Sequence, residues 1–194
     1  MNSEPDLQSA ALKQLIQDVT TIVTQGGGEN VVTVAVAERL TLALRGELGL
    51  PADYMRPQEH SYVMYPVWVA PSASFCVASA VWGVGQRTPI HDHGTWGVVG
   101  IYSGVEREER YGLDATVEQP VPRMLNERLL RCGDVVVCCT SDRDVHRVSS
   151  ASDTPCVGLH IYGADIGSLP RRSYHPETGA VGWFVSGWAN SAGE

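Results

Sequence analysis

Two histidines at alternate positions of the chain, His91 and His93, have the spacing of metal ligands. Alternate side chains of an extended strand share one face, so both imidazoles can converge on a single ion. Imidazole is a ligand for iron, zinc, nickel and copper. A pair of this kind is weak evidence by itself, and the residues around it decide its meaning.

The glycines on either side of this pair strengthen the assignment. Five residues separate Gly85 from His91, and ten residues separate His93 from Gly104. These positions match the first cupin motif, G-x5-H-x-H-x3-E-x6-G, at every spacing. The sequence departs from that motif at one position, because Gly97 stands where the motif places a glutamate ligand.

A third histidine fits the second cupin motif. His146 lies in the segment Asp144-Val145-His146-Arg147-Val148, after a Gly133-Asp134 turn and a valine-rich segment. Residues 85–149 therefore resemble the cupin superfamily. The resemblance implies a mainly β fold, the double-stranded β-helix or jelly-roll barrel, and a metal site formed by His91, His93 and His146.

The missing glutamate changes the expected chemistry. Three neutral imidazoles leave the charge of a divalent metal uncompensated, which favours an anionic ligand such as a thiolate and leaves positions open for substrate and dioxygen. Among cupins, thiol dioxygenases use such a site. The blocks 91–97, 144–149 and 159–163 resemble the cysteine dioxygenase type I family, most closely its bacterial branch with the 3-mercaptopropionate dioxygenases, over residues 62–187.

This resemblance implies a role for each matching residue. His91, His93 and His146 would bind Fe(II), and His160 with Tyr162 would form a hydrogen-bond network beside the metal. The family places a serine two residues before that histidine, whereas this chain has Gly158, which shortens the network. The alternative interpretation of His160 is a buried histidine with a structural role only.

The implied substrate is a small thiol carboxylate of the cysteine or 3-mercaptopropionate type, oxidised with O2 to its sulfinate. Family members carry an arginine or a glutamine on an early strand for the carboxylate, and residues 62–68 contain neither. Arg171 and Arg172 are the substitutes we expect, because a guanidinium group binds a carboxylate with two parallel hydrogen bonds. The alternative is a solvated Arg-Arg pair on a loop.

Two other functions stay open at this point. One is a different metal-dependent cupin reaction, such as dioxygenation of a carbon substrate or an isomerisation. The other is a cupin that binds a metal or a ligand without turnover. Iron with oxygen uptake on thiols would favour the first assignment, and binding without oxygen uptake would favour the last.

The elements that must position these residues follow from hydrophobic periodicity. Apolar residues recur at three and four over 5–24 and continue over 30–48, which predicts two helices. From residue 62 the pattern changes to short strands near ten residues apart, typical of an antiparallel sandwich or barrel. We expect a helical segment over 1–60 packed on a barrel over 61–194, in a single domain. The expected strands are 62–70, 75–84, 98–102, 105–111, 124–130, 134–139, 145–149 and 156–162.

Composition limits the partners. The 194 residues carry a formal net charge of −8, which disfavours nucleic acid and anionic membranes. The five cysteines form no C-x-x-C pair, and no apolar run is long enough to span a bilayer. We expect a cytoplasmic monomer or small homo-oligomer whose partners are a thiol and O2. The charge run at 106–110 predicts a solvated hairpin.

Overall fold

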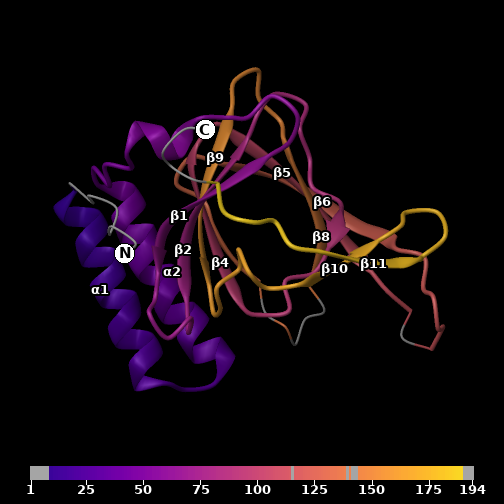
Figure 1. Ribbon diagram of the computed structural model, residues 1–194, viewed down its shortest axis with the longest axis horizontal. Coiled ribbons are helices and arrows are strands. Elements are labelled where there is room, and N and C mark those ends of the chain that lie inside the picture. Colours follow the sequence, from indigo (N-terminus) through magenta and orange to yellow (C-terminus); the bar gives the residue numbers. More distant parts are fainter. Residues whose placement is uncertain (1–8, 115, 139, 141–143, 190–194) are drawn as a thin grey trace.

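The computed structural model describes residues 9–114, 116–138, 140 and 144–189. In this part of the chain, two N-terminal helices lie against a barrel of antiparallel strands, as Figure 1 shows. The early strands β1, β2 and β4 lie beside the helices, and the last strands, β10 and β11, lie on the opposite side of the barrel.

The two helices bury one apolar face each. Helix α1 spans Ala10–Gln25, begins where the Ser9 hydroxyl accepts a hydrogen bond from the Leu12 amide, and ends at Gly26. Helix α2 spans Glu29–Arg45, and a short 3-10 helix, η1, spans Ala52–Met55. Both predicted helices are confirmed within a few residues, except that 5–8 lie outside the described residues. The buried side chains are Leu12, Leu15, Ile16 and Val19 on α1, and Val32, Thr33, Val36 and Leu40 on α2.

Eleven strands are formed by the described residues, and the eight predicted ones are among them. They are β1 (Val63–Val69), β2 (Cys76–Trp82), β3 (Ile90–His91), β4 (Gly97–Ser103), β5 (Val105–Gly112), β6 (Arg123–Arg131), β7 (Val135–Cys138), β8 (Val145–Ser150), β9 (Cys156–Tyr162), β10 (Arg171–Tyr174) and β11 (Val181–Phe184). The sequence did not predict β3, β10 or β11, because two to four residues are too few to show a period.

The strand order defines the fold class. One sheet runs β1-β2-β9-β4-β7, and the other runs β11-β10-β3-β8-β5-β6, with antiparallel pairing throughout. The last four strands of each order, β2-β9-β4-β7 and β3-β8-β5-β6, have the arrangement of an eight-stranded jelly roll. The predicted fold, a mainly β double-stranded β-helix with N-terminal helices, is confirmed.

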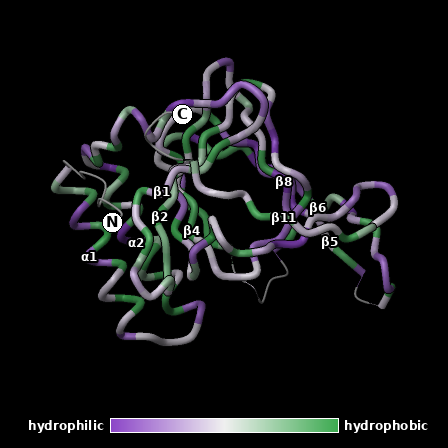
Figure 2. The backbone as a smooth tube through the Cα atoms, viewed as in Figure 1, coloured by the Kyte–Doolittle hydropathy of each residue, from purple (hydrophilic) through white to green (hydrophobic). Residues whose placement is uncertain are grey.

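The helices and the second sheet cover opposite faces of the first sheet. Strands β2 and β9 are buried at every position, which requires a cover on both faces. On β9, Val157, Leu159 and Ile161 pack in the core shared with the helices. Alternation then turns His160 and Tyr162 into the barrel. Figure 2 shows hydrophobic residues along the strands of the first sheet and on the helices.

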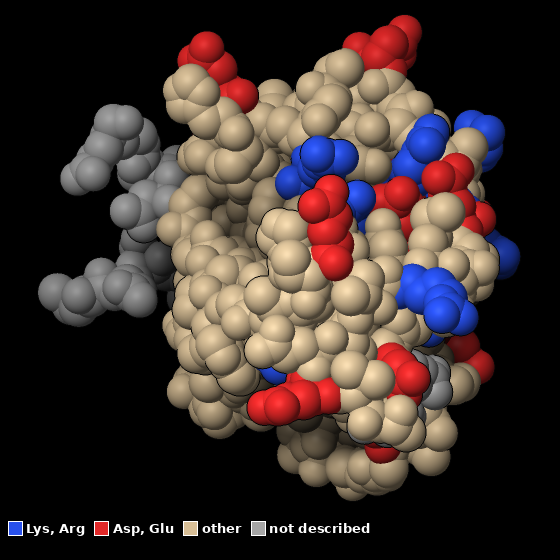
Figure 3. All heavy atoms as spheres, turned by 90° about the vertical axis from the view of Figure 1, so that its right-hand side faces the viewer, with Lys and Arg blue, Asp and Glu red and all other residues tan. Residues whose placement is uncertain are grey.

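The outer face of the second sheet carries charged side chains beside exposed apolar ones such as Leu125 and Leu129. Arg107 on β5 and Glu127 on β6 form an exposed ion pair at 3.4 Å. Figure 3 shows residues of both signs interspersed on this side of the molecule. Among the described residues, no helix has the length and apolar character needed to cross a bilayer.

Candidate metal centre

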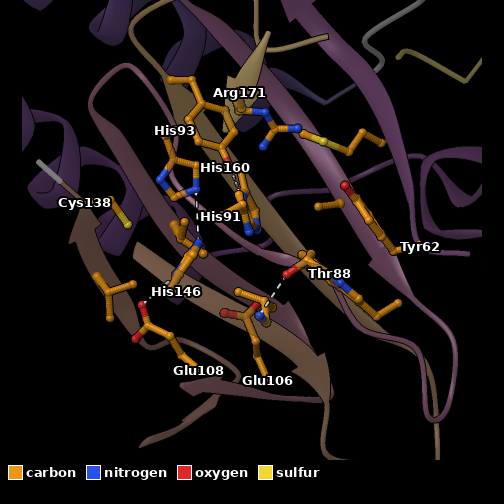
Figure 4. A pocket seen from close by; sticks show the side chains of 17 residues that line it. Tyr62, Thr88, His91, His93, Glu106, Glu108, Cys138, His146, His160 and Arg171 are labelled. Atoms are coloured by element: carbon orange, nitrogen blue, oxygen red, sulfur yellow. Dashed lines mark hydrogen bonds and ion pairs between the residues drawn. The ribbon is translucent and has the colours of Figure 1, made fainter. Parts of the chain in front are cut away.

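Three buried histidines meet inside the barrel. His91 on β3 is the register partner of His146 on β8, and His93 follows β3 after one residue. One ring nitrogen of each lies within 4.8 Å of those of the other two. Figure 4 shows the three side chains grouped on one wall of a pocket. The structure thus brings together the three residues expected to bind metal.

Each imidazole is oriented by an oxygen atom that contacts its Nδ1. Because a carbonyl or carboxylate oxygen only accepts, each Nδ1 donates to its oxygen, which leaves Nε2 as the nitrogen that faces the cluster. Metal-binding histidines have this arrangement, in which the outer oxygen sets the tautomer and the ring orientation. The contacts are Pro89 O with His91 (3.0 Å), Asp144 Oδ2 with His93 (2.7 Å) and Glu108 Oε1 with His146 (3.0 Å).

The nitrogen separations fit a single metal ion. The Nε2 atoms of His93 and His146 lie 3.2 Å apart. Two nitrogens bound to one ion at about 2.1 Å lie about 3 Å apart when the angle at the metal is a right angle. Burial lowers the pKa of His91 and of His93, which keeps both rings in the neutral form that binds metal. The donor set therefore fits a divalent transition metal.

Two buried carboxylates behind the histidines were not found from the sequence. Burial raises the pKa of Glu108, but its hydrogen bonds with His146 and Arg128 outweigh burial and lower that pKa to about 2. Asp144 is held ionised in the same way by its contact with His93. Two negative charges thus lie directly behind the cluster, and they offset part of the charge of a bound cation.

The predicted solvated hairpin at 106–110 is therefore wrong for two of its residues. Glu106 and Glu108 are each only 2 % exposed. They alternate with exposed or half-buried residues along β5, so both point into the barrel. The sequence did contain a signal, because Glu106 and Glu108 are two residues apart in a predicted strand and therefore share one face. The high charge of the segment favoured the solvated interpretation instead.

The position of the missing motif glutamate is closed by an aromatic ring. Gly97 is the register partner of Tyr162, and a Cβ atom at Gly97 would lie 3.0 Å from both Cδ1 and Cε1 of that tyrosine. A side chain at position 97 therefore competes with the tyrosine ring for the same space. The tyrosine ring in turn lies 5.3 Å from that of His93, centre to centre.

His160 and Tyr162 interact with each other beside the histidine cluster. His160 Nδ1 and the Tyr162 hydroxyl are 2.8 Å apart, and both side chains are buried. Burial lowers the pKa of His160 to about 3, so the ring is neutral. Its other nitrogen, Nε2, is buried and has no hydrogen-bond partner among the described residues. The structure thus brings His160 and Tyr162 together beside His93.

The two candidate arginines point to opposite faces of β10. Arg171 is buried in the pocket wall, where its guanidinium group lies 4.6 Å from the ring centre of Phe184 and donates to Ser186 Oγ. Arg172 is half exposed on the outer face and forms an ion pair with Asp92 at 2.6 Å. Arg171 lines the pocket that contains all three histidines, whereas Arg172 lines a second pocket, which includes His93 and Asp144.

The Arg171 side chain retains donor capacity. Its Nε atom is buried without a partner among the described residues. A guanidinium group cannot lose its charge, so an unused buried donor favours an anion. The hydroxyl of Tyr62, 2.9 Å from Ser186 Oγ, lies at the same end of the pocket (Figure 4).

The rest of the pocket is mostly apolar. The cavity itself is narrow, because the space that a water-sized sphere can occupy is about 20 Å³, room for about one water molecule. Burial raises the pKa of the Cys138 thiol well above its usual value, so this cysteine stays protonated. The apolar lining comprises Met64, Ala80, Trp82, Val99, Val136 and Val148.

No protein-family model matches the chain. Similar solved structures include a conserved protein with a double-stranded β-helix domain from Klebsiella pneumoniae, with 16% identity, coverage of 60% of this chain and 90% of that one, and a TM-score of 0.43. A hydroquinone 1,2-dioxygenase complexed with Cd²⁺ and 4-hydroxybenzonitrile has 17% identity, 54% and 66% coverage, and a TM-score of 0.43.

A third similar structure is the cupin domain of an XRE-family transcriptional regulator from Enterobacter cloacae, with 15% identity, 53% and 96% coverage, and a TM-score of 0.37. These structural neighbours are cupins and double-stranded β-helix proteins, and they include both an enzyme and a regulator domain. Likeness at this level leaves the activity to be inferred from the site itself.

Proposed function

We propose that the protein is a non-heme Fe(II) thiol dioxygenase that oxidises a small thiol carboxylate, of the cysteine or 3-mercaptopropionate type, to its sulfinate. The observation that carries this proposal is a three-histidine cluster and a buried arginine with an unused donor, Arg171, in the wall of one pocket. A ligand that joins the two needs an anionic end for the arginine and a metal-binding end for the histidines. A thiol carboxylate has both.

The closed position at Gly97 supports the same substrate class. Since Tyr162 fills the space of a fourth protein ligand, three imidazoles are the donors that face the centre. When bound, ferrous iron would supply the redox chemistry, in which both atoms of O2 end on sulfur and the thiol proton is released. Thiolate is a soft, charged donor that suits a site of neutral imidazoles.

The chain's own residues then bind, orient and exclude water. Arg171 would hold the substrate carboxylate through charge-assisted hydrogen bonds, while Ser186 fixes its guanidinium plane. The Tyr162 hydroxyl, oriented by His160, would hold a proton beside the sulfur. The apolar lining keeps bulk water from the reacting atoms.

Oxygen consumption tests the proposal. Metal-free protein is loaded anaerobically with Fe(II) and mixed with cysteine, 3-mercaptopropionate, mercaptosuccinate or cysteamine. The masses of the products formed under ¹⁸O2 are then measured by mass spectrometry. We expect uptake with at least one carboxylate thiol and a sulfinate that carries two ¹⁸O atoms. His93→Ala should lose both iron and uptake, whereas His60→Ala, at an exposed histidine, should retain them.

Stoichiometric iron without uptake on any thiol would overturn the proposal. Uptake on a substrate without sulfur would instead indicate a carbon dioxygenase, and tight thiol binding without uptake would indicate a binding protein. Each of these outcomes replaces the proposed reaction with one of the alternatives left open by the sequence.

A further inference from the structure

Two buried polar atoms that face the same small space have no partner among the described residues. One is His160 Nε2, on the side of the ring opposite Tyr162, and the other is Glu106 Oε2. His160 is 4 % exposed and Glu106 is 2 % exposed. Unsatisfied buried polar atoms are rare in folded proteins, because each one loses its hydrogen bonds to water.

Gly158 creates the space that separates them. A Cβ atom at this glycine would lie 2.5 Å from His160 Nε2 and 3.7 Å from Glu106 Oε2. Those two distances limit the separation of the two polar atoms to about 6 Å. One water molecule that hydrogen-bonds to both spans such a gap, and a small rotation of the glutamate brings its oxygen closer.

The charged groups around Glu106 are already paired with each other. Glu108 contacts both His146 and Arg128, and neither of these two neighbours forms a hydrogen bond with Glu106 Oε2. Figure 4 shows Glu106 and His160 among the side chains directed into the pocket from β5 and β9. Glu106 Oε2 and His160 Nε2 are thus two buried polar atoms without a partner among the described residues, and both lie close to Gly158.

We propose that Glu106 is the positioning residue of His160, and that its carboxyl group hydrogen-bonds to Nε2 of the imidazole, directly or through one water, in the space left by Gly158. Glu106, His160 and Tyr162 then form one chain of hydrogen bonds that ends at the tyrosine hydroxyl beside the metal centre. This carboxyl group takes the place of the serine hydroxyl that the resemblance led us to expect at position 158.

This chain of hydrogen bonds determines which nitrogen of His160 carries the proton. A neutral imidazole has one N–H, so a partner on each nitrogen selects one tautomer, whereas a partner on Nδ1 alone leaves the other nitrogen open. A single tautomer fixes whether the Tyr162 hydroxyl donates to the ring or toward the pocket. The consequence for catalysis rests on the proposed function, but the tautomer itself does not.

Histidine ring NMR on the metal-free protein tests the inference without any turnover. In ¹⁵N-histidine-labelled protein, long-range ¹H–¹⁵N spectra report the protonation of each ring nitrogen, and His160→Asn assigns the His160 signals. We expect two well-separated ¹⁵N shifts in the wild type, as for a single tautomer. Glu106→Leu should move these shifts toward each other, while Glu106→Gln, which keeps hydrogen-bonding groups, should preserve them.

A second variant and a matched control distinguish loss of the Glu106–His160 hydrogen bond from a general effect of substitution on the structure. Gly158→Ala fills the space between the two atoms while keeping Glu106, and it should change the His160 shifts as Glu106→Leu does. Ser79→Ala removes a buried hydroxyl on β2 that donates a hydrogen bond to Tyr54 O. This hydroxyl is not part of the hydrogen bonds that link Glu106, His160 and Tyr162, so the His160 shifts should stay unchanged.

Unchanged His160 shifts in both Glu106→Leu and Gly158→Ala would overturn the inference, as would an equal change in Ser79→Ala. Oxygen uptake by the iron-loaded wild type reports separately on the proposed function. Oxygen uptake by the wild type together with unchanged His160 shifts in the variants would support the dioxygenase and reject the role of Glu106. Changed His160 shifts without oxygen uptake would support the role of Glu106 and reject the dioxygenase.

Discussion

The Asp144 carboxylate lies 2.7 Å from Nδ1 of His93, and both side chains are buried. This contact fixes the tautomer of the ring and places a negative charge behind the cluster that faces the pocket. Metal affinity should therefore depend on Asp144, although this residue acts on the metal site through its hydrogen bond with His93.

We predict that Asp144→Asn weakens metal binding about ten- to a hundred-fold, the usual effect of removing such a carboxylate. The asparagine still accepts a hydrogen bond from His93 but lacks the charge. Anaerobic equilibrium dialysis with Fe(II) measures the affinity. Glu127→Gln, which removes an equal charge from the exposed pair with Arg107, is the control. Equal affinities for wild type and Asp144→Asn would show that the carboxylate has no part in metal binding.

Arg171→Ala should impair only substrates that carry a carboxylate. Loss of a charge-assisted hydrogen bond of about 1.5–3 kcal/mol corresponds to a fall of about ten- to a hundred-fold in kcat/KM for 3-mercaptopropionate. Cysteamine, which lacks the carboxylate, should be converted at the wild-type rate. Arg172→Ala, the adjacent residue on the outer face of β10, should leave both substrates unaffected. A similar loss for the two thiols would argue against carboxylate binding by Arg171.

Glu106 should make the metal-free protein less stable as the pH rises from about 4.5 to about 8, whereas the lowered pKa values of the buried histidines act in the opposite direction below about pH 6.5. Burial raises the pKa of Glu106 from 4.5 to about 8, so in this window the folded state holds a proton that the unfolded chain has released. The contribution of Glu106 to the free energy of unfolding then falls with pH, by up to about 1.4 kcal/mol per pH unit. Below pH 4.5 both states are protonated and the effect vanishes.

Urea unfolding at several pH values measures this slope. Glu106→Gln should remove the Glu106 contribution, because the amide does not titrate, so its stability relative to the wild type should increase with pH up to about pH 8. Glu127→Gln, at an exposed glutamate, should keep the wild-type slope. Parallel pH profiles for wild type and Glu106→Gln would contradict the prediction.

Gly97→Ala should destabilise the fold by about 1–3 kcal/mol through overpacking. The added methyl group meets the Tyr162 ring at 3.0 Å, and the ring is enclosed by the pocket wall. Urea unfolding compares this variant with Gly46→Ala, whose added methyl would have only an ordinary contact at 3.7 Å. Equal stabilities for the two variants would show that the tyrosine can move aside.

The sequence predicted the elements whose patterns are local. Both helices and eight strands follow from apolar periodicity, and the spacing of His91, His93 and His146 matched motifs within a chain region that does fold into a jelly roll. Periodicity succeeds here because each long element repeats its apolar residues several times within its own length. Strands β3, β10 and β11 are held by their neighbours in the sheet and show no such repeat.

Which charged residues enter the pocket was decided by the tertiary structure. Arg171 and Arg172 are adjacent on a strand, so one of them must face inward, and the register of β10 with β3, Ser173 beside His91, selects Arg171. No local pattern contains that register.

The same reasoning holds for the glutamates of β5. A charge run favours solvent unless buried partners are present, and the partners of Glu108 come from β6 and β8. The sequence by itself therefore determined the jelly-roll elements and the candidate metal ligands. Only the assembled barrel placed Glu106, Glu108 and Arg171 around them, because burial of a charge depends on groups that arrive from distant strands.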